Sequence, residues 1–293
     1  MTTLLVTGAS GHLGRRVLEL LLEAGETHII ATTRTPEKLA DFAARGVTVR
    51  TATFDDPESL RAAFTGADRL LLISTDALGV PGLRERQHRT AIEAAAAVGV
   101  KHVVYTSLVN PVNTPIPLAP DHAATEAALE SSTLGYTILR NNVYADGLPG
   151  MLTQALGMGG KLFSAVGDGK IAYVTREDCA RAAAAALAAS FEGRRVLDVT
   201  GPEAISHAEL AAIGTAVYGQ PITYIPLSVE VMTQQLVQAG LPEPIAQLIV
   251  SFDDAGLQGK LNGVSAAVQD LTGQPAMRIA DFIAAQPNPQ ASH

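Results

Sequence analysis

Short runs of apolar and β-branched residues alternate with longer amphipathic stretches through the first half of the chain. The apolar runs lack a clean alternation of polar and apolar positions, as is typical of strands buried on both faces. They predict strands at Leu4–Thr7, His28–Thr33, Val47–Thr51, Arg69–Ile73, His102–Thr106 and Tyr136–Leu139. The amphipathic stretches predict helices at Leu13–Glu23, Glu37–Arg45, Glu58–Phe64, Gln87–Val98 and Ala124–Ser131. Repeated strand–helix–strand units of this length predict an α/β fold with a doubly wound parallel sheet.

The pattern changes after Tyr144. Residues 145–170 are rich in glycine and poor in strand formers, which indicates a connection or capping segment. Thr175–Asp178 and Ser206–Glu209 have the spacing of capping boxes and predict helix starts near residues 176 and 207. The remaining expectations are a strand at Arg195–Thr200, short helices broken by Pro and Gly over 221–285, and a frayed tail at Gln286–His293.

Composition excludes several classes of protein. Of the 293 residues 47% are apolar and 17% are charged, which argues against intrinsic disorder. The net charge is −8 and the basic residues are scattered, so we expect no nucleic-acid partner. The longest apolar run, Ala182–Ala189, is far shorter than the ~20 residues of a membrane span, so we expect no membrane partner.

Cysteine content and the start of the chain suggest a compartment. Cys179 is alone, which excludes an intramolecular disulfide and any metal site built from several cysteines. Met1–Thr7 contains no Lys or Arg and runs directly into a glycine motif, so we expect no signal peptide. These features predict a soluble, reduced, cytoplasmic protein.

The strand at Leu4–Thr7 runs into Gly8-Ala-Ser-Gly11-His-Leu-Gly14 and then directly into a helix. In such a motif Gly8 makes a tight turn, Gly11 lets the backbone approach a pyrophosphate, and Gly14 lets the helix pack on the strand. The start of the helix adds free N–H groups for the anion. We therefore predict a Rossmann-type dinucleotide site; the alternative is an ordinary glycine turn. The loop residues Ser10, His12 and Leu13 belong to the same predicted site.

The end of the second predicted strand bears on the choice of cofactor. About 20 residues after the last glycine, an NAD-specific site places an acidic residue that holds the ribose hydroxyls. Here the sequence reads Thr32-Thr33-Arg34, with no acid before Glu37. A guanidinium suits a 2′-phosphate, so Arg34 favours NADPH, with NADH as the weaker cofactor. The alternative is that Arg34 is a solvated surface residue. Arg15 is either a second phosphate ligand or an exposed helix residue.

The usual catalytic pair of short-chain reductases, a Tyr followed four residues later by a Lys, is absent. None of the six tyrosines has Lys at that spacing, and no Lys occurs between Lys101 and Lys161. That mechanism is excluded. In the corresponding place stand His122 and Glu126, which share one helical face, so the carboxylate can orient and charge the imidazole. The pair is an acid, a scaffold for the cofactor ribose or a plain surface pair. A metal pair would lack further ligands, and we assign no metal site.

Polar residues follow three other predicted strands, where a doubly wound sheet opens its cleft. Ser74 and Thr75 follow the fourth strand and are expected to face the cofactor. Thr106 and Ser107 end the fifth, and Ser107 is placed to hydrogen-bond a substrate oxygen. The sixth ends near Asn141 and Tyr144, which are expected to reach the nicotinamide and the substrate. Arg140 is interpreted as a structural ion pair. The predicted catalytic set is Ser107, His122, Asn141 and Tyr144.

These residues together resemble the NmrA-like branch of the atypical short-chain dehydrogenases/reductases. Within it, the chain is most similar to the group of bacterial NAD(P)H:quinone oxidoreductases type 2, with the triphenylmethane reductases nearby. The matching segments are Thr7-Gly-Ala-Ser-Gly-His-Leu-Gly14, Val100-Lys-His-Val-Val-Tyr-Thr-Ser-Leu108, His122-x-x-x-Glu126, Tyr136-Thr-Ile-Leu-Arg-Asn141 with Tyr144, Gly167-Asp-Gly-Lys-Ile171, Val199-Thr-Gly201 and Gly240-Leu-Pro242.

The resemblance implies an NADP-binding Rossmann domain over residues 1–145, to which 171–200 returns. A smaller C-terminal α/β substrate domain over residues 146–293 would cap the cleft. It also implies hydride transfer to quinones, dyes and related electrophiles. One departure is visible: relatives carry Gly-Asp after the third strand, the Asp contacting adenine, whereas this chain has Ala52-Thr53 followed by Phe54. Adenine recognition would then rest on Thr53 or on packing by Phe54.

The leading hypothesis is an NADPH-dependent oxidoreductase that reduces a small conjugated or aromatic carbonyl, a quinone or a ketone. Ser107, Tyr144 or His122 would hydrogen-bond the oxygen that gains charge. The alternative is a non-catalytic NADP(H)-sensing regulator of the NmrA type; an NAD-dependent epimerase is disfavoured by the missing Tyr–Lys pair and by Arg34. The partners considered are a small-molecule substrate and a second copy of the chain in a homodimer.

Overall fold

A seven-stranded sheet forms the centre of the computed structural model, which describes residues 1–287. Every neighbouring pair in this sheet is parallel, in the order β3-β2-β1-β4-β5-β6-β9. The strand order reverses between β1 and β4, which is where ligands bind in doubly wound sheets. The predicted fold class is therefore confirmed. The strands are β1 (Leu4–Val6), β2 (Ile29–Thr33), β3 (Thr48–Thr51), β4 (Arg69–Leu72), β5 (His102–Leu108), β6 (Gly135–Asn141) and β9 (Arg194–Val199).

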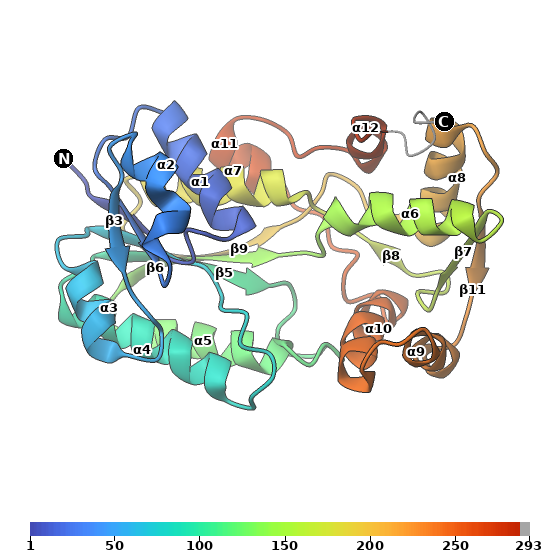
Figure 1. The fold of residues 1–293 in the computed structure, drawn as a ribbon, viewed down its shortest axis with the longest axis horizontal. Helices are drawn as coiled ribbons and strands as arrows, with labels where there is room; N and C mark the ends of the chain where they lie inside the picture. Colours follow the sequence, from blue (N-terminus) through green and yellow to red (C-terminus); the bar gives the residue numbers. More distant parts are fainter. Residues whose placement is uncertain (288–293) are drawn as a thin grey trace.

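Helices cover both faces of the sheet (Figure 1). One layer holds α1 (His12–Glu23), η1 (Pro36–Leu39), α2 (Ala40–Ala43), α7 (Arg176–Ala188) and α11 (Ala267–Thr272); the other holds α3 (Pro57–Phe64), α4 (Leu83–Ala97) and α5 (Ala119–Ser131). The side chains of β1 show how both faces become buried. Leu4 and Val6 join the core beneath α1 and α7, whereas Leu5 joins the core beneath α3 and α4. Strands covered in this way need no polar face, which explains their continuous apolar runs.

A smaller part of the chain lies beyond the carboxyl edge of the sheet, at the right in Figure 1. Its strands form two small sheets, β10 antiparallel to β8 and β11 parallel to β7. Within residues 1–287, no helix is long and apolar enough to span a bilayer. The elements of this part are η2 (Ala145–Gly147), α6 (Leu148–Gly157), β7 (Lys161–Ser164), β8 (Lys170–Ile171), β10 (Ile205–Ser206), α8 (His207–Tyr218), β11 (Thr223–Pro226), α9 (Val229–Gln238), α10 (Glu243–Leu257) and α12 (Ile279–Ala284).

Local sequence patterns predicted the bounds of some elements accurately and those of others poorly. Both predicted helix starts are confirmed, but only Ser206 with Glu209 forms the predicted capping box. Thr175 accepts from Asp178 N, whereas the Asp178 carboxylate accepts from Arg181 and from the Met277 amide instead of reaching back to the cap. The glycine-rich stretch 145–170, predicted as a connection or capping segment, folds into η2, α6 and β7 and reaches the first residue of β8, so it is not an unstructured connection. Helices α4 and α5 begin several residues earlier than predicted, and the helix expected at 37–45 divides into η1 and α2. Most of the predicted frayed tail, residues 288–293, lies outside the described residues.

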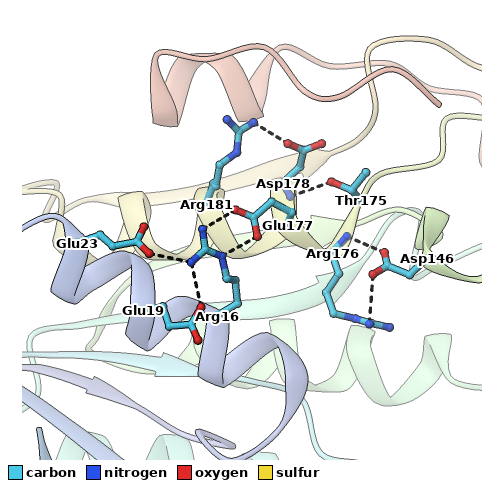
Figure 2. Close-up of polar contacts among 9 residues, drawn as sticks. All are labelled: Arg16, Glu19, Glu23, Asp146, Thr175, Arg176, Glu177, Asp178 and Arg181. Atoms are coloured by element: carbon cyan, nitrogen blue, oxygen red, sulfur yellow. Dashed lines mark hydrogen bonds and ion pairs between the residues drawn. The ribbon is translucent and has the colours of Figure 1, made fainter. Parts of the chain in front are cut away.

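Helix α7 packs against the sheet although it follows the smaller part in sequence. Arg16 on α1 binds both carboxylate oxygens of Glu177 on α7, at 2.7 and 3.0 Å, as Figure 2 shows. At the other end of α7, the buried guanidinium of Arg69 donates to the carbonyls of Ala186, Leu187 and Phe191 at 2.7–3.1 Å. The bonds to Ala186 and Leu187 satisfy carbonyls that the end of the helix leaves unpaired, and the bond to Phe191 holds the segment that follows. They tie α7 to α1 and β4.

Several histidines are buried inside this framework. Burial lowers the pKa of His88 and His102 to about 3 and that of His207 to about 4. Their ring nitrogens bond neutral partners, among them Thr125, Thr137 and Tyr173. Each imidazole therefore stays uncharged in the folded protein at pH values where an exposed histidine takes up a proton.

We expect the free energy of unfolding to fall as the pH drops from 6.5 to about 4. In this window the unfolded chain binds protons at His88, His102 and His207 that the folded chain does not bind. Each histidine removes up to ~1.4 kcal/mol of stability per pH unit. Asp253 has the opposite effect: burial raises its pKa to about 6, so in this window the folded chain binds one proton there that the unfolded chain does not bind. Urea unfolding at pH 7, 6 and 5 measures this slope. The replacement His102→Gln should reduce it, and a flat profile would contradict the account.

Candidate cofactor and active site

The glycine loop joins β1 to α1 with very little room. Gly8 has φ +57°, the left-handed conformation that favours glycine. A Cβ added to Gly14 would overlap the Gly8 carbonyl oxygen and lie 2.8 Å from Ala9 Cα, so only glycine lets α1 approach so closely. Gly11 is the N-cap of α1 and has no side chain to occupy the first N–H groups of the helix. These N–H groups are available for an anion.

A hollow of about 310 Å³ opens beside this loop. It lies where the carboxyl ends of β1, β2, β3 and β4 meet the first turns of α4. Of the predicted cofactor residues, its lining contains Gly8, Ser10, Gly11, Arg34, Thr53, Phe54, Ser74 and Thr75. Four others lie around it: His12 is exposed at the start of α1, Leu13 and Gly14 are buried beneath the loop, and Thr106 accepts from Ser74 N at 2.9 Å. The lining also includes residues that the sequence analysis missed, chiefly Thr35, Lys38, Asp55, Asp76 and Gln87.

Arg34 and Lys38 place positive charge on one side of the hollow, and both are exposed. The loop is linked to this side because the hydroxyls of Ser10 and Thr33 lie 2.9 Å apart. Arg15 is otherwise engaged: it pairs with Asp41 at 2.6 Å and donates to the Lys38 carbonyl at 2.7 Å. It therefore braces the turn that carries Lys38, and the interpretation as a helix residue is the better one.

Behind Thr75, a hydrogen-bonded chain leads to α5. The Thr75 amide donates to His88 Nε2 at 2.9 Å, and His88 Nδ1 lies 2.9 Å from Thr125 Oγ1. Thr125 donates onward to the Asp121 carbonyl at 2.7 Å. This order of donors requires a neutral imidazole protonated on Nδ1, in agreement with its lowered pKa. His88 thus fixes the backbone at the end of β4. Sequence reasoning missed it, since a single histidine on a helix gives no signal.

The predicted pairing of Glu126 with His122 is wrong. Glu126 Oε1 accepts from Ser107 at 2.6 Å and from Arg140 Nε at 3.0 Å, while Oε2 accepts from Arg140 Nη2 at 2.6 Å. The structural ion pair expected for Arg140 is confirmed. Because Ser107 directs its proton to the carboxylate, it offers lone pairs rather than a donor to a substrate oxygen. The prediction failed because the tertiary fold brings Ser107 of β5 and Arg140 of β6 to Glu126, and these donors bind the carboxylate in place of the imidazole on its own helix.

His122 is enclosed by two other side chains. Its Nε2 lies 3.0 Å from Arg84 Nη2, which can only donate, and its Nδ1 lies 2.8 Å from the Tyr105 hydroxyl. Burial and the nearby Arg84 charge lower the pKa of His122 well below its usual range. The imidazole is therefore neutral rather than charged by a carboxylate. Among residues 1–287, no group of three or more acidic, His or Cys side chains gathers as a metal site.

Asn141 and Tyr144 form a separate pair where β6 leads into the smaller part. Asn141 Nδ2 donates to the Tyr144 hydroxyl at 3.2 Å, which leaves the phenol proton for another acceptor. Asn141 Oδ1 is buried and has no partner within the described chain. The guanidinium of Arg176 lies 5.3 Å from the centre of the Tyr144 ring. It also pairs with Asp146 at 3.2 Å, as Figure 2 shows. Burial raises the pKa of Tyr144, so the phenol stays protonated.

The doubly wound sheet and its glycine loop are those of a Rossmann-type dinucleotide-binding protein, and sequence comparison supports this class. The profile of the NAD(P)H-binding family matches residues 8–190, and the chain belongs to this family. Quinone oxidoreductase 2 of Escherichia coli is 37% identical over 279 residues, which cover 95% of this chain and 96% of the relative.

Solved structures extend the similarity to the whole fold. The NADPH-dependent quinone oxidoreductase of E. coli in complex with NADPH has a TM-score of 0.91 at 36% identity, covering 96% of this chain and 98% of that one. The triphenylmethane reductase of Citrobacter sp. in complex with NADP(H) has a TM-score of 0.88 at 33% identity, with the same coverage. The predicted resemblance is confirmed, as is the class of NAD(P)H-dependent oxidoreductase; the sensor is not favoured.

Replacing Arg34 with Ala should raise the KM for NADPH roughly tenfold or more and leave that for NADH nearly unchanged. If Arg34 binds the 2′-phosphate, the variant loses a charged hydrogen bond to NADPH, whereas NADH has no 2′-phosphate to lose contact with. Initial rates with both cofactors measure the effect. Arg45→Ala provides a control, because Arg45 is exposed and does not line the hollow. Equal changes for the two cofactors would contradict the assignment.

Replacing His122 with Ala should act mainly on stability. The variant leaves the buried Arg84 guanidinium without its acceptor, which we expect to lower the free energy of unfolding by ~2–4 kcal/mol. The kcat of the folded variant should change by less than the ~10²-fold typical of a lost proton donor. Urea unfolding and initial rates, measured at a temperature where the variant is folded, separate the two effects. A 10²-fold loss of kcat at unchanged stability would restore His122 as the acid.

Proposed function

We propose that the protein is an NADPH-dependent reductase that delivers hydride to a quinone. One observation carries the proposal: the glycine loop and the strand ends that line the hollow share the carboxyl edge of one parallel sheet with the polar groups at the ends of β5 and β6. The quinone and dye reductases that share this fold over the whole chain support the same chemistry. Ketones and related electrophiles are further candidate acceptors.

The residues around the hollow fit a nicotinamide dinucleotide phosphate. The free N–H groups at the start of α1 would hold the pyrophosphate, and Arg34 with Lys38 would hold the 2′-phosphate. Asn141 Oδ1, buried and unpaired within the described residues, suits the carboxamide N–H of the nicotinamide. When bound, the reduced cofactor supplies a hydride.

Tyr144 is the group we assign to the substrate oxygen. Its phenol accepts from Asn141 and therefore has its own proton to donate. With a raised pKa, it acts as a hydrogen-bond donor to the developing negative charge rather than as a strong acid. A quinone suits this arrangement because its reduced oxygen is a stabilised phenolate that can take its proton from water. The Ser107 hydroxyl is held by Glu126, and His122 links α5 to Arg84 of α4 and Tyr105 of β5.

Organisation and location are also proposals. Residues 1–145, with 171–200, would form the NADP-binding domain, and 146–293 would cap the substrate. The pairing of β9 with β6 supports the return of 171–200, and α11, which packs on α7, adds a later segment to the same layer. A cytoplasmic location suits a cofactor that other enzymes must reduce again after each turnover. The homodimer is tested by sedimentation of the purified protein.

The reductase is tested by following NADPH oxidation at 340 nm against quinones, aryl ketones and a triphenylmethane dye. We expect turnover with quinones, and slower turnover with simple ketones because their alkoxide product needs a better proton donor. Tyr144→Phe should lower kcat roughly 10- to 100-fold with quinones while leaving NADPH affinity unchanged. Lack of turnover with every acceptor, despite equally tight binding of NADPH and NADP⁺, would contradict the reductase and favour the sensor.

A further inference from the structure

Thr53, at the end of the hollow nearest β3, stands where relatives are expected to carry an aspartate. Its polar groups are engaged in bonds within the turn rather than directed at a ligand. The Thr53 amide donates to Ser59 Oγ at 3.2 Å, and its carbonyl accepts from the same hydroxyl at 3.2 Å. The Thr53 hydroxyl accepts from the Asp55 amide at 3.4 Å. Thr53 therefore stabilises the turn between β3 and α3. That turn places the Asp55 side chain on the wall of the hollow.

Asp55 meets Gln87, a residue of α4 that lies 32 positions later in the chain. Gln87 Nε2 donates to Asp55 Oδ1 at 2.9 Å. A carboxylate can only accept, so the NH₂ end of the amide must face Asp55 and Gln87 Oε1 must point elsewhere. That oxygen is buried and accepts no hydrogen bond from any residue of 1–287. A buried acceptor without a partner is costly, which makes it a candidate ligand contact.

The charges around the hollow are segregated. Arg34 and Lys38 occupy the side formed by β2 and η1, whereas Asp55 and Asp76 occupy the side formed by β3, β4 and α4. A phosphate is attracted to the first side and repelled from the second. The carboxylate side therefore suits a neutral group that donates hydrogen bonds. In a dinucleotide with its 2′-phosphate at Arg34, the remaining group of the adenosine half is the base.

We propose that Asp55 and Gln87 together recognise the exocyclic amino group of adenine, an inference that rests on the proposed NADPH-binding function. The amino group carries two N–H donors and no acceptor. Asp55 accepts the Gln87 amide at Oδ1 and can take a further donor at Oδ2, while Gln87 Oε1 receives the second. A base with a carbonyl at this position, such as hypoxanthine, presents lone pairs to lone pairs and is rejected. The pair thus sets base specificity in place of the missing aspartate.

The test compares the binding of NADPH with that of its hypoxanthine analogue, in the absence of any acceptor substrate. Isothermal titration calorimetry is suitable, since the chain contains no Trp to report binding by fluorescence. We expect the protein to bind NADPH at least tenfold more tightly than the analogue. Asp55→Ala should weaken NADPH binding roughly tenfold, affect the analogue little and bring the ratio close to one. Gln87→Leu should lower the same ratio.

Glu58→Ala is the matched control. Glu58 also carries a carboxylate, three residues further on, but it pairs with Arg61 on α3 and does not line the hollow. This variant should keep both affinities. Asp55 is exposed, so Asp55→Ala should fold, which thermal unfolding checks.

The outcomes separate this proposal from the reductase. Equal affinity of the wild type for the two dinucleotides would overturn the assignment of Asp55 and Gln87, as would tenfold discrimination that persists in Asp55→Ala. Neither result would contradict the reductase if the protein still turns over quinones. Discrimination without turnover on any acceptor would support the assignment and contradict the reductase. Failure to bind either dinucleotide would overturn both.

Discussion

The close contact between Gly14 and the Gly8 carbonyl positions the rest of the site. With no space for a Cβ, α1 lies directly on the loop that leaves β1, and its first N–H groups reach the carboxyl edge of the sheet beside the switch point. Once α1 is placed, Arg16 and Glu177 place α7 next to it. The hollow opens beside this loop, at the same edge of the sheet as the polar ends of β5 and β6.

Outside the hollow, the polar groups near the ends of β4, β5 and β6 have a property in common: most of them are neutral, or an opposite charge is paired with them. His88 and His122 are uncharged because burial lowers their pKa values, and Glu126 is matched by Arg140. Such an edge holds hydrogen-bond donors and acceptors in fixed directions but offers no strong acid. This arrangement suits acceptors that stabilise the negative charge they gain. It also accounts for how the protein can lack the Tyr–Lys pair of ordinary short-chain reductases.

Much of the fold was predictable because its signals are local. The glycine loop, the buried strands and the side-chain caps at Thr175 and Ser206 each depend on a few neighbouring residues. The prediction that His122 pairs with Glu126 was wrong because i, i+4 spacing shows only that two residues share a helical face. It does not show that Arg140 of β6 binds Glu126 or that Arg84 of α4 binds His122. Asp55 and Gln87 were missed for the same reason: nothing in the sequence indicates that residues 32 positions apart meet across a hollow. Helix α6 formed in a glycine-rich stretch because tertiary packing buries Leu148, Leu152 and Ala155.

The bonds of Arg69 to the end of α7 also bear on how such proteins diverge. This strand residue closes a helix more than a hundred positions later, and β9 and α11 belong to the same assembly. The part of the chain built around the seven-stranded sheet is therefore not a continuous segment. A single genetic crossover near residue 145 would separate α7 from the residues that hold it. Exchange of the smaller part among relatives should instead proceed by replacement of the insert between β6 and α7, and of the segment between β9 and α11, with the joints left intact.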